Sequence, residues 1–386
     1  MRTVTRDGGF PLEWGTTRRG WLLATLGTLL MRPGWAAAER PATLLSAWQD
    51  GAEQHVGLLS VDGTRWSVQT SLQVPTRAHG LWAERSGSVL AVARRPGDWL
   101  LRWRPADGTA QWQWIEGDRR FNGHVITSSD GATVWTTETD LDTAQGRLGV
   151  RHAASLEKTA EWSTHGLDPH QLLALPQPVA GFPAGTLMVA NGGIPTLPET
   201  GRIKRRLERM DASLVALDPV RGTCLGQWRL NDPFLSIRHL AFDPVAGRLG
   251  VALQAEHPDG TARVVAPVLA IWDGTGLRTA DRQPALAGYG GDICALPGTA
   301  EGGFAVSCPR ADTLALFDAQ GGWRTGLAHA EACALAADAH RWWSGSGRSA
   351  ADLLYGSDPG TRDMVHVPCA EGLRLQMDNH WLLRNG

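Results

Sequence analysis

One short pattern recurs along the chain and limits its fold more than any other feature. A histidine or an acidic residue is followed by a short apolar run and then by a turn or a break, as in "HLAFDPVAG" and "DICAL". The pattern starts at His79, His124, His170, His239, Asp292, Glu331 and His380. Successive starts are 45, 46, 69, 53, 39 and 49 residues apart. Repeats of roughly 40 to 50 residues with about four strands each are typical of β-propeller blades.

The rest of the chain after residue 40 also indicates an all-β protein. Short runs rich in Val, Leu, Trp and Thr alternate with Asp-Gly, Pro-Gly and Ala-Gly turns, and long amphipathic helical stretches are missing. We therefore predict a single seven-bladed β-propeller domain over residues 39–386. The last start, His380, has too few residues after it for a blade, so we expect one C-terminal strand to join the three N-terminal strands "TLLSAWQ", "HVGLLSV" and "RWSVQTSL" and close the ring.

The first 38 residues indicate an export signal. Arg18 and Arg19 precede an apolar stretch of signal-peptide length, and "AAAE" offers a cleavage site after Ala38. The stretch is too short for a stable membrane span, because Arg32 and Pro33 interrupt it. We expect a periplasmic protein exported by the twin-arginine pathway, with an uncleaved N-terminal anchor as the alternative.

Composition and motifs exclude several classes of function. The net charge is −2, and only one loop carries a basic run, so nothing indicates nucleic-acid binding. The five cysteines are odd in number and form no C-x-x-C pair, which argues against a disulfide framework or a thiolate zinc site and favours small core residues. The chain has no G-x-S-x-G or H-E-x-x-H motif.

The seven pattern starts predict a metal site. The first strand of a propeller blade lines the central channel, so the residues that open these strands should form a ring at one mouth. Imidazole and carboxylate are ligands that iron, copper, zinc and manganese accept. We predict a transition metal, with iron preferred and copper as the second choice. A purely structural polar ring and direct capture of an anionic small molecule are the two alternatives.

Loops that should reach the same face supply further candidates. Arg94 and Arg95 of "ARRPGD" and Asn191 of "NGGI" are candidate ligand-binding residues. Glu138 and Asp140 of "TTETDLD" are either additional ligands or, as we prefer, ion-pair partners of these two arginines.

An insertion at residues 191–211 explains the 69-residue step. Its basic residues are Arg202, Lys204, Arg205, Arg206 and Arg209. It is a candidate lid, or a dock for an acidic partner, and a solvated insertion without a role is the alternative.

The same stretches resemble a known family. "HGLW…ARRPGD", "GHVITSSDGATVWTTETDLDTAQGRLGV", "HGLDPHQLLAL", "VANGGIPTLPETGR", "SIRHLAFD" and "DNHWLLR" are similar to the exported bacterial proteins grouped as domain of unknown function 1513. The resemblance implies a seven-bladed propeller of the kind grouped with quinoprotein amine dehydrogenase β-chain-like and YVTN-repeat (WD40-like) folds. It also implies operon partners of the imelysin and haem-peroxidase types, and hence a part in iron acquisition. The family carries no established activity.

These observations favour a monomeric, non-catalytic protein that binds a metal in periplasmic iron uptake. One alternative is an enzyme, either a lactonase-like hydrolase or a metal-dependent oxidoreductase, with Glu331 or Asp292 as its general base. The other is a protein-interaction scaffold whose polar ring is structural.

Overall fold

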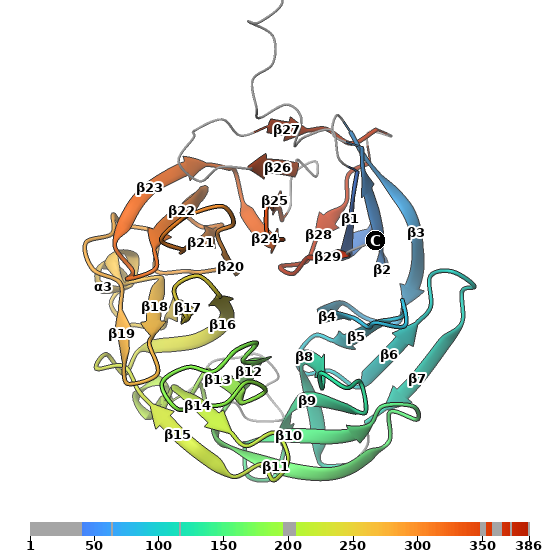
Figure 1. Ribbon diagram of the computed structural model, residues 1–386, viewed down its shortest axis with the longest axis horizontal. Coiled ribbons are helices and arrows are strands. Elements are labelled where there is room, and N and C mark those ends of the chain that lie inside the picture. The colour runs from blue at the N-terminus through green and yellow to red at the C-terminus, as the bar shows by residue number, and fades with distance from the viewer. Residues whose placement is uncertain are drawn as a thin grey trace, which may run out of the picture.

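The protein, described from a computed structural model, is a β-propeller whose sheets are arranged in a ring around a central axis (Figure 1). The structure describes residues 41–62, 65–115, 117–195, 206–347, 353–356, 365–370 and 373–384. The proposed export signal and residues 196–205 of the insertion lie outside these ranges. The arrangement of the described strands confirms the expected all-β propeller.

Six blades contain four antiparallel strands each, ordered from the channel outward as they follow in the sequence. The first is β4 (Ala78–Ala83), β5 (Val89–Ala93), β6 (Trp99–Trp103) and β7 (Ala110–Trp114). The second is β8 (Arg119–Thr127), β9 (Thr133–Asp140), β10 (Gln145–His152) and β11 (Lys158–Leu167). The third is β12 (Pro169–Ala174), β13 (Leu187–Asn191), β14 (Ser213–Leu217) and β15 (Cys224–Trp228).

The other three follow in the same order around the ring. The fourth is β16 (Leu235–Asp243), β17 (Arg248–Ala255), β18 (Leu269–Trp272) and β19 (Leu277–Thr279), with the short helix α3 (Gly260–Val265) between β17 and β18. The fifth is β20 (Ile293–Ala295), β21 (Gly303–Cys308), β22 (Thr313–Asp318) and β23 (Trp323–Ala328). The sixth is β24 (Ala332–Ala337), β25 (Trp342–Ser346), β26 (Leu353–Gly356) and β27 (Val365–Val367).

A five-stranded sheet joins the two ends of the chain and closes the ring. It combines β1 (Ala42–Asp50), β2 (Glu53–Val61) and β3 (Trp66–Val74) with β28 (Gln376–Met377) and β29 (Leu382–Arg384). Both C-terminal strands pair with β1. This corrects the expectation of one C-terminal strand and of seven blades of about four strands, because the ring consists of six four-stranded blades and this five-stranded sheet. The residues between β28 and β29 leave the sheet and carry His380.

Aspartate-initiated turns connect many of the strands. In "DPVAG" the Asp243 carboxylate accepts hydrogen bonds from the backbone N–H groups of Val245 and Ala246, and Gly247 has a φ of 63°. Asp218 and Gly222 form the same turn in "DPVRG". Glycine adopts this left-handed conformation without strain, so the spacing of Asp and Gly ends each strand at a defined residue.

The core lies between neighbouring sheets rather than in one centre. The cluster formed by Leu214, Leu249 and their neighbours joins the third and fourth blades, and similar clusters fill the other junctions. Trp66, Trp99, Trp103, Trp272 and Trp342 are fully buried in these layers. A buried tryptophan removes about 150–250 Å² from water, which corresponds to roughly 4–6 kcal/mol of transfer free energy. These side chains therefore stabilise the packing between neighbouring blades.

The cysteines behave as small side chains in the described structure. All five are free, and Cys294, Cys308 and Cys333 are buried. No helix in the described ranges has the length and apolar character needed to cross a membrane.

Candidate metal centre

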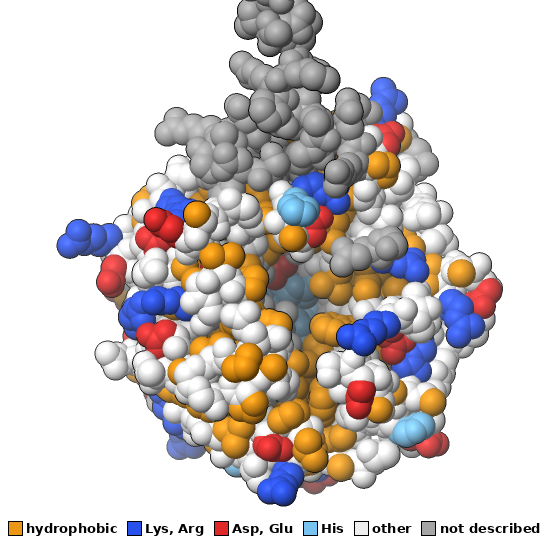
Figure 2. Space-filling view, viewed as in Figure 1, with side chains coloured by type: hydrophobic (Ala, Val, Ile, Leu, Met, Phe, Trp, Pro, Cys, Tyr) orange, Lys and Arg blue, Asp and Glu red, His pale blue; other side chains and the backbone are white. Residues whose placement is uncertain are grey.

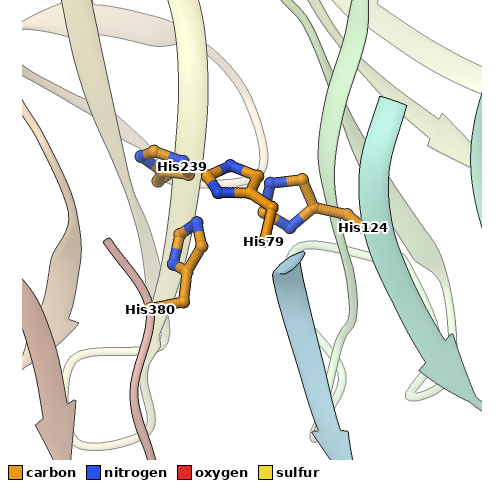
Figure 3. Close-up of side chains that lie close together, drawn as sticks. All are labelled: His79, His124, His239 and His380. Atoms are coloured by element: carbon orange, nitrogen blue, oxygen red, sulfur yellow. The ribbon is translucent and has the colours of Figure 1, made fainter. Parts of the chain in front are cut away.

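Four histidines from distant parts of the chain converge inside the channel. His79 comes from β4, His124 from β8, His239 from β16, and His380 from the segment between β28 and β29. Their rings point toward one another (Figure 3). One ring nitrogen of each lies within 4.8 Å of one ring nitrogen of every other. The sequence pattern therefore identified residues that the fold does bring together.

Bulges in the inner strands place these side chains. The pairing of β4 with β5 shifts register between Ala78 and Leu81, which brackets His79, and that of β8 with β9 shifts between Phe121 and Val125, which brackets His124. The β12–β13 pair shifts between Pro169 and Leu172, which brackets His170, and the β16–β17 pair shifts between Ile237 and His239, directly before the ring-bearing residue. A bulge bends a strand and re-aims a side chain, so the repeated bulges turn the imidazoles toward the axis.

Two glycines allow the closest pair of strands to approach. A Cβ atom on Gly80 would collide with the carbonyl oxygen of Gly123. Gly123 has a φ of 98°, and a Cβ there would lie 2.9 Å from Cδ2 of His79. The His-Gly and Gly-His pairs at 79–80 and 123–124 thus let the rings of His79 and His124 come within 4.9 Å, centroid to centroid.

The histidines are more deeply placed than the sequence predicts. We expected an open ring at the channel mouth, but His79, His124, His239 and His380 are each at most 8% exposed. Figure 2 shows histidine side chains at the bottom of the central opening. Burial lowers the pKa of His79 to about 3 and the pKa values of His124 and His239 well below the ordinary value. These rings are neutral at physiological pH, which is the form that binds a metal.

Asp378 orients His79. The Nδ1 atom of His79 lies 2.8 Å from Oδ1 of Asp378, so the neutral ring donates this hydrogen bond and leaves Nε2 as its metal-binding atom. Arg77 also pairs with this carboxylate, and Nη1 of Arg94 lies 3.6 Å from it. Burial opposes ionisation of Asp378, but the hydrogen bond from His79 and the two guanidinium groups hold its pKa well below the usual range.

Asp292 stands in a similar relation to His380. Its Oδ1 atom lies 3.3 Å from Nδ1 of His380, while its carboxylate accepts hydrogen bonds from the backbone N–H groups of Ile293 and Leu335. Burial raises the pKa of Asp292. The residue predicted as a ligand thus lies behind a histidine, where it orients the ring.

His170 is a fifth member of the cluster. Its Nε2 atom lies 2.9 Å from Nε2 of His239, so one of these two nitrogens carries the proton and the other accepts it. Its ring is 4.7 Å from that of His124. His170 is buried, and burial lowers its pKa well below the ordinary value.

Glu331 does not reach the histidines. It precedes β24 in a turn where its N–H donates to Asp312 and its carbonyl accepts from Gly347, and its φ of 50° directs the chain differently from Asp292. Glu331 lines a larger cavity, of about 330 Å³. The letter-by-letter match of "EACAL" with "DICAL" therefore does not extend to the position of the acid.

Two other candidates, Glu138 and Asp140, form ion pairs within their own blade. Glu138 is fully buried and pairs with Arg151 at 2.7 Å and Lys158 at 3.0 Å. Asp140 pairs with Arg119 and Arg147. Neither pairs with Arg94 or Arg95, which corrects the predicted pairing, because β8, β10 and β11 of the same blade supply nearer cations.

Asn191 has a structural role. Its side-chain amide donates to the backbone carbonyl of Thr164 in the second blade at 2.8 Å and to the hydroxyl of Ser213 in its own blade at 3.3 Å. It lines neither cavity described here. Of the insertion's basic residues, Arg202, Lys204 and Arg205 lie outside the described residues, so the predicted lid stays a prediction.

Arg94 and Arg95 lie beside the histidines, and their predicted role in ligand binding stays a prediction. Both line a cavity of about 140 Å³ that His79, His170 and His239 also border. Arg95 pairs with Asp168, and so does Arg238 at 2.7 Å.

Two aspartates were missed although the sequence carries a signal for them. Asp378 and Asp168 each stand two residues before a cluster histidine, in "DNH" and "DPH". The spacing indicates the acids but not their partners, because Asp378 pairs with His79 and Asp168 pairs with Arg95 and Arg238. The same spacing places Asn122 before His124.

Comparisons with known proteins agree with the fold and name no activity. A sequence model of the family described as protein of unknown function (DUF1513) matches residues 72–384. No curated protein matches the chain. Among solved structures, a chain in the crystal structure of the mitotic checkpoint complex is similar with a TM-score of 0.53. The similarity covers 78% of this chain and 89% of that chain at 12% sequence identity, so the likeness concerns the fold alone.

Proposed function

The chain belongs to the DUF1513 family of proteins of unknown function. We propose that it binds one transition-metal ion with His79, His124, His239 and His380. The ion would occupy the channel axis where the four rings meet. Ligand nitrogens around one ion are separated by roughly 3–4 Å, since each metal–nitrogen bond is about 2.0–2.1 Å long. The 4.8 Å limit on the present separations therefore calls for only a small contraction.

The observation that carries this proposal is a set of buried ring nitrogens that the protein does not satisfy. Nε2 of His124, Nδ1 of His239 and Nε2 of His380 have no hydrogen-bond partner among the described residues. A buried polar atom without a partner costs about 1–3 kcal/mol. A purely structural ring would gain stability from protein partners at these atoms, whereas a metal site requires their lone pairs.

The donor set also limits the metal. Four neutral imidazoles suit iron, copper, zinc and nickel, and they supply no charge to balance a trivalent ion. We therefore favour iron(II), in keeping with the family resemblance, with copper as the alternative. A bound metal would supply either redox chemistry or a cargo to hand on; the chain itself supplies neutral donors, burial and a restricted approach.

The surrounding residues would tune such a site. Asp378 and Asp292 fix the Nδ1 sides of His79 and His380 and so raise the basicity of these ligands. His170 contacts His239 and is close enough to serve as a fifth ligand after a rotation of its ring.

The setting that we propose is the periplasm, reached by twin-arginine export, with a role in iron uptake beside imelysin-like or haem-peroxidase-like partners. Its supports are Arg18 and Arg19 before the apolar leader and the resemblance to exported family members. We propose no catalysed reaction, because Asp292 is already engaged by His380 and two backbone N–H groups and is poorly placed as a general base.

Metal analysis of the full chain tests this function. The purified protein would be stripped with a chelator, loaded anaerobically with iron(II), copper or zinc, desalted and analysed for bound metal. We expect about one ion per chain, and loss of most of it in the double variant His124→Asn/His239→Asn.

A matched control separates site loss from general damage. His329 is also a buried histidine, but it is not part of the cluster. Its Nδ1 atom lies 3.0 Å from the hydroxyl of Ser344. His329→Asn should keep its metal. Equal metal retention in both variants, or no retained metal in the wild type under any loading condition, would refute the proposal.

A further inference from the structure

The cavity that borders the histidines has a strongly positive lining. It is about 140 Å³ in volume, and its walls include four arginines, Arg94, Arg95, Arg238 and Arg310, but no aspartate or glutamate. Tyr289, Asn122, Asn379 and Gln254 add neutral polar groups. His79, His170 and His239 form the side that faces the proposed metal. A pocket with this lining is suited to an anion.

Part of the hydrogen-bonding capacity of these arginines is unused by the protein. Nη1 of Arg94 and Nε of Arg238 are buried without a hydrogen-bond partner among the described residues. The guanidinium of Arg310 lies over the ring of Tyr289, 4.1 Å from its centroid. Burial lowers the pKa values of Arg94 and Arg238, which is the expected effect of cations crowded in a poorly hydrated place.

The carboxylates nearby are shared among several cations. Asp168 pairs with both Arg95 and Arg238, and Asp378 pairs with Arg77 and lies near Arg94. Asp292 lies beside His380, the negative charge of Glu256 favours the charged form of Arg238, and Glu331 lines the larger cavity. The four arginines of the lining and Arg77 thus carry five positive charges, and these five carboxylates balance them at most one for one. A divalent ion on neutral imidazoles would add two positive charges that no protein group balances.

We propose that this cavity binds a small carboxylate anion, held by Arg94, Arg95 and Arg238 on one side and coordinated to the histidine-bound metal on the other. This inference rests on the proposed function, because the anion completes the coordination of the metal. A planar carboxylate matches the fork of a guanidinium group and offers a second oxygen to the metal. Metal and anion therefore bind cooperatively.

The size of the cavity agrees with such a ligand. A cavity of roughly 150 Å³ can hold a six-membered carbon ring. The space of about 140 Å³ is thus adequate for a carboxylate of four to six non-hydrogen atoms. Arg94, Tyr289, Arg310 and Asn379 line both this cavity and the larger one, which indicates an approach route from the larger cavity.

Cooperative binding can be measured with zinc and acetate as probes. Zinc has no redox chemistry, and acetate binds free zinc too weakly to strip it from the protein. The dissociation constant of zinc would be measured on the full chain by competition with a chromophoric chelator, with and without acetate. We expect acetate to tighten zinc binding by at least about fivefold, and zinc to tighten acetate binding by the same factor, as linkage requires.

Two arginine variants show where the anion lies. Arg94→Gln should abolish the effect of acetate, measured as the ratio of the zinc dissociation constants of this variant with and without acetate, so that any change in the zinc affinity itself cancels. Arg278→Gln, which removes a surface arginine paired with Asp273, is the matched control and should keep the effect.

The outcomes separate this inference from the function on which it rests. Zinc binding that acetate does not change, or an acetate effect that survives in Arg94→Gln, would overturn the anion site and leave the metal centre standing. A chain that binds no zinc but binds acetate through Arg94 would overturn the metal centre and the bridging role together.

Discussion

The Nδ1 atom of His79 and Oδ1 of Asp378 form a buried hydrogen bond of 2.8 Å across 299 positions of sequence. His79 belongs to β4, whereas Asp378 follows β28 in the sheet that closes the ring. Ring closure and the candidate metal centre therefore depend on the same C-terminal segment. A chain whose ends did not pair would lack His380, Asp378 and a supported His79.

Asp378→Asn tests the role of this carboxylate. The variant keeps the shape of the side chain but loses the charge that raises the basicity of His79, so we expect a 10- to 100-fold weaker metal affinity, measured by chelator competition. Asp338→Asn, which affects a carboxylate paired with Arg341 in a hairpin turn, is the control. Equal affinities in the two variants would show that Asp378 does not support the site.

The buried neutral histidines make stability depend on pH. Unfolded histidines take up protons near pH 6.5, whereas burial holds the pKa of His79 at about 3 and those of His124, His170 and His239 well below 6.5. The free energy of unfolding of the metal-free protein should fall as pH decreases from about 6.5 toward 3, by about 1.4 kcal/mol per pH unit for each such histidine. The raised pKa of Asp292 offsets part of this loss.

Urea unfolding between pH 7 and pH 4 measures this dependence. In His124→Asn, the slope of the free energy of unfolding against pH should decrease by about 1.4 kcal/mol per pH unit, because one fewer proton is taken up on unfolding. A stability that does not change over this range would contradict the buried neutral state of the cluster.

Glu138→Ala separates stability from metal binding. The substitution leaves Arg151 buried without its main partner, so we expect a loss of about 3–5 kcal/mol in the free energy of unfolding. Metal content after loading should equal that of the wild type, because the Glu138 carboxylate pairs with Arg151 and Lys158 and not with a histidine of the cluster. A variant of unchanged stability that lost its metal would reverse this assignment.

Thiol labelling checks the burial of the cysteines. Burial raises the pKa values of Cys308 and Cys333 to about 12 and also raises that of Cys294, so few thiolates form at neutral pH. Mass spectrometry of the native protein treated with iodoacetamide should show rapid modification of the exposed Cys224 and none of these three. Rapid labelling of Cys308 would contradict the packing of β21.

The blade starts and the histidines could be predicted because they are periodic. A period of 40 to 50 residues assigns each start to an inner strand, and inner strands surround one channel. This argument places His79, His124, His170, His239 and His380 near a common axis without further knowledge of packing.

Other features of the site depend on local backbone geometry that the period does not contain. The bulges at His79 and His124 turn these rings inward, and the turn before Ala332 keeps Glu331 from following Asp292. Asp378 was missed because its partner His79 is close only after the ring closes. The pairing of Glu138 was wrong because Arg151, on the next strand of its own blade, is nearer than Arg94.

X-ray absorption at the zinc edge of the loaded protein tests the central claim most directly. The account predicts a first shell of four or five imidazole nitrogens and at most two carboxylate oxygens, at about 2.0–2.1 Å from the zinc ion. This first shell should be lost in His124→Asn/His239→Asn. A first shell that is dominated by sulfur, or one that is unchanged in the double variant, would contradict metal binding by the histidine cluster.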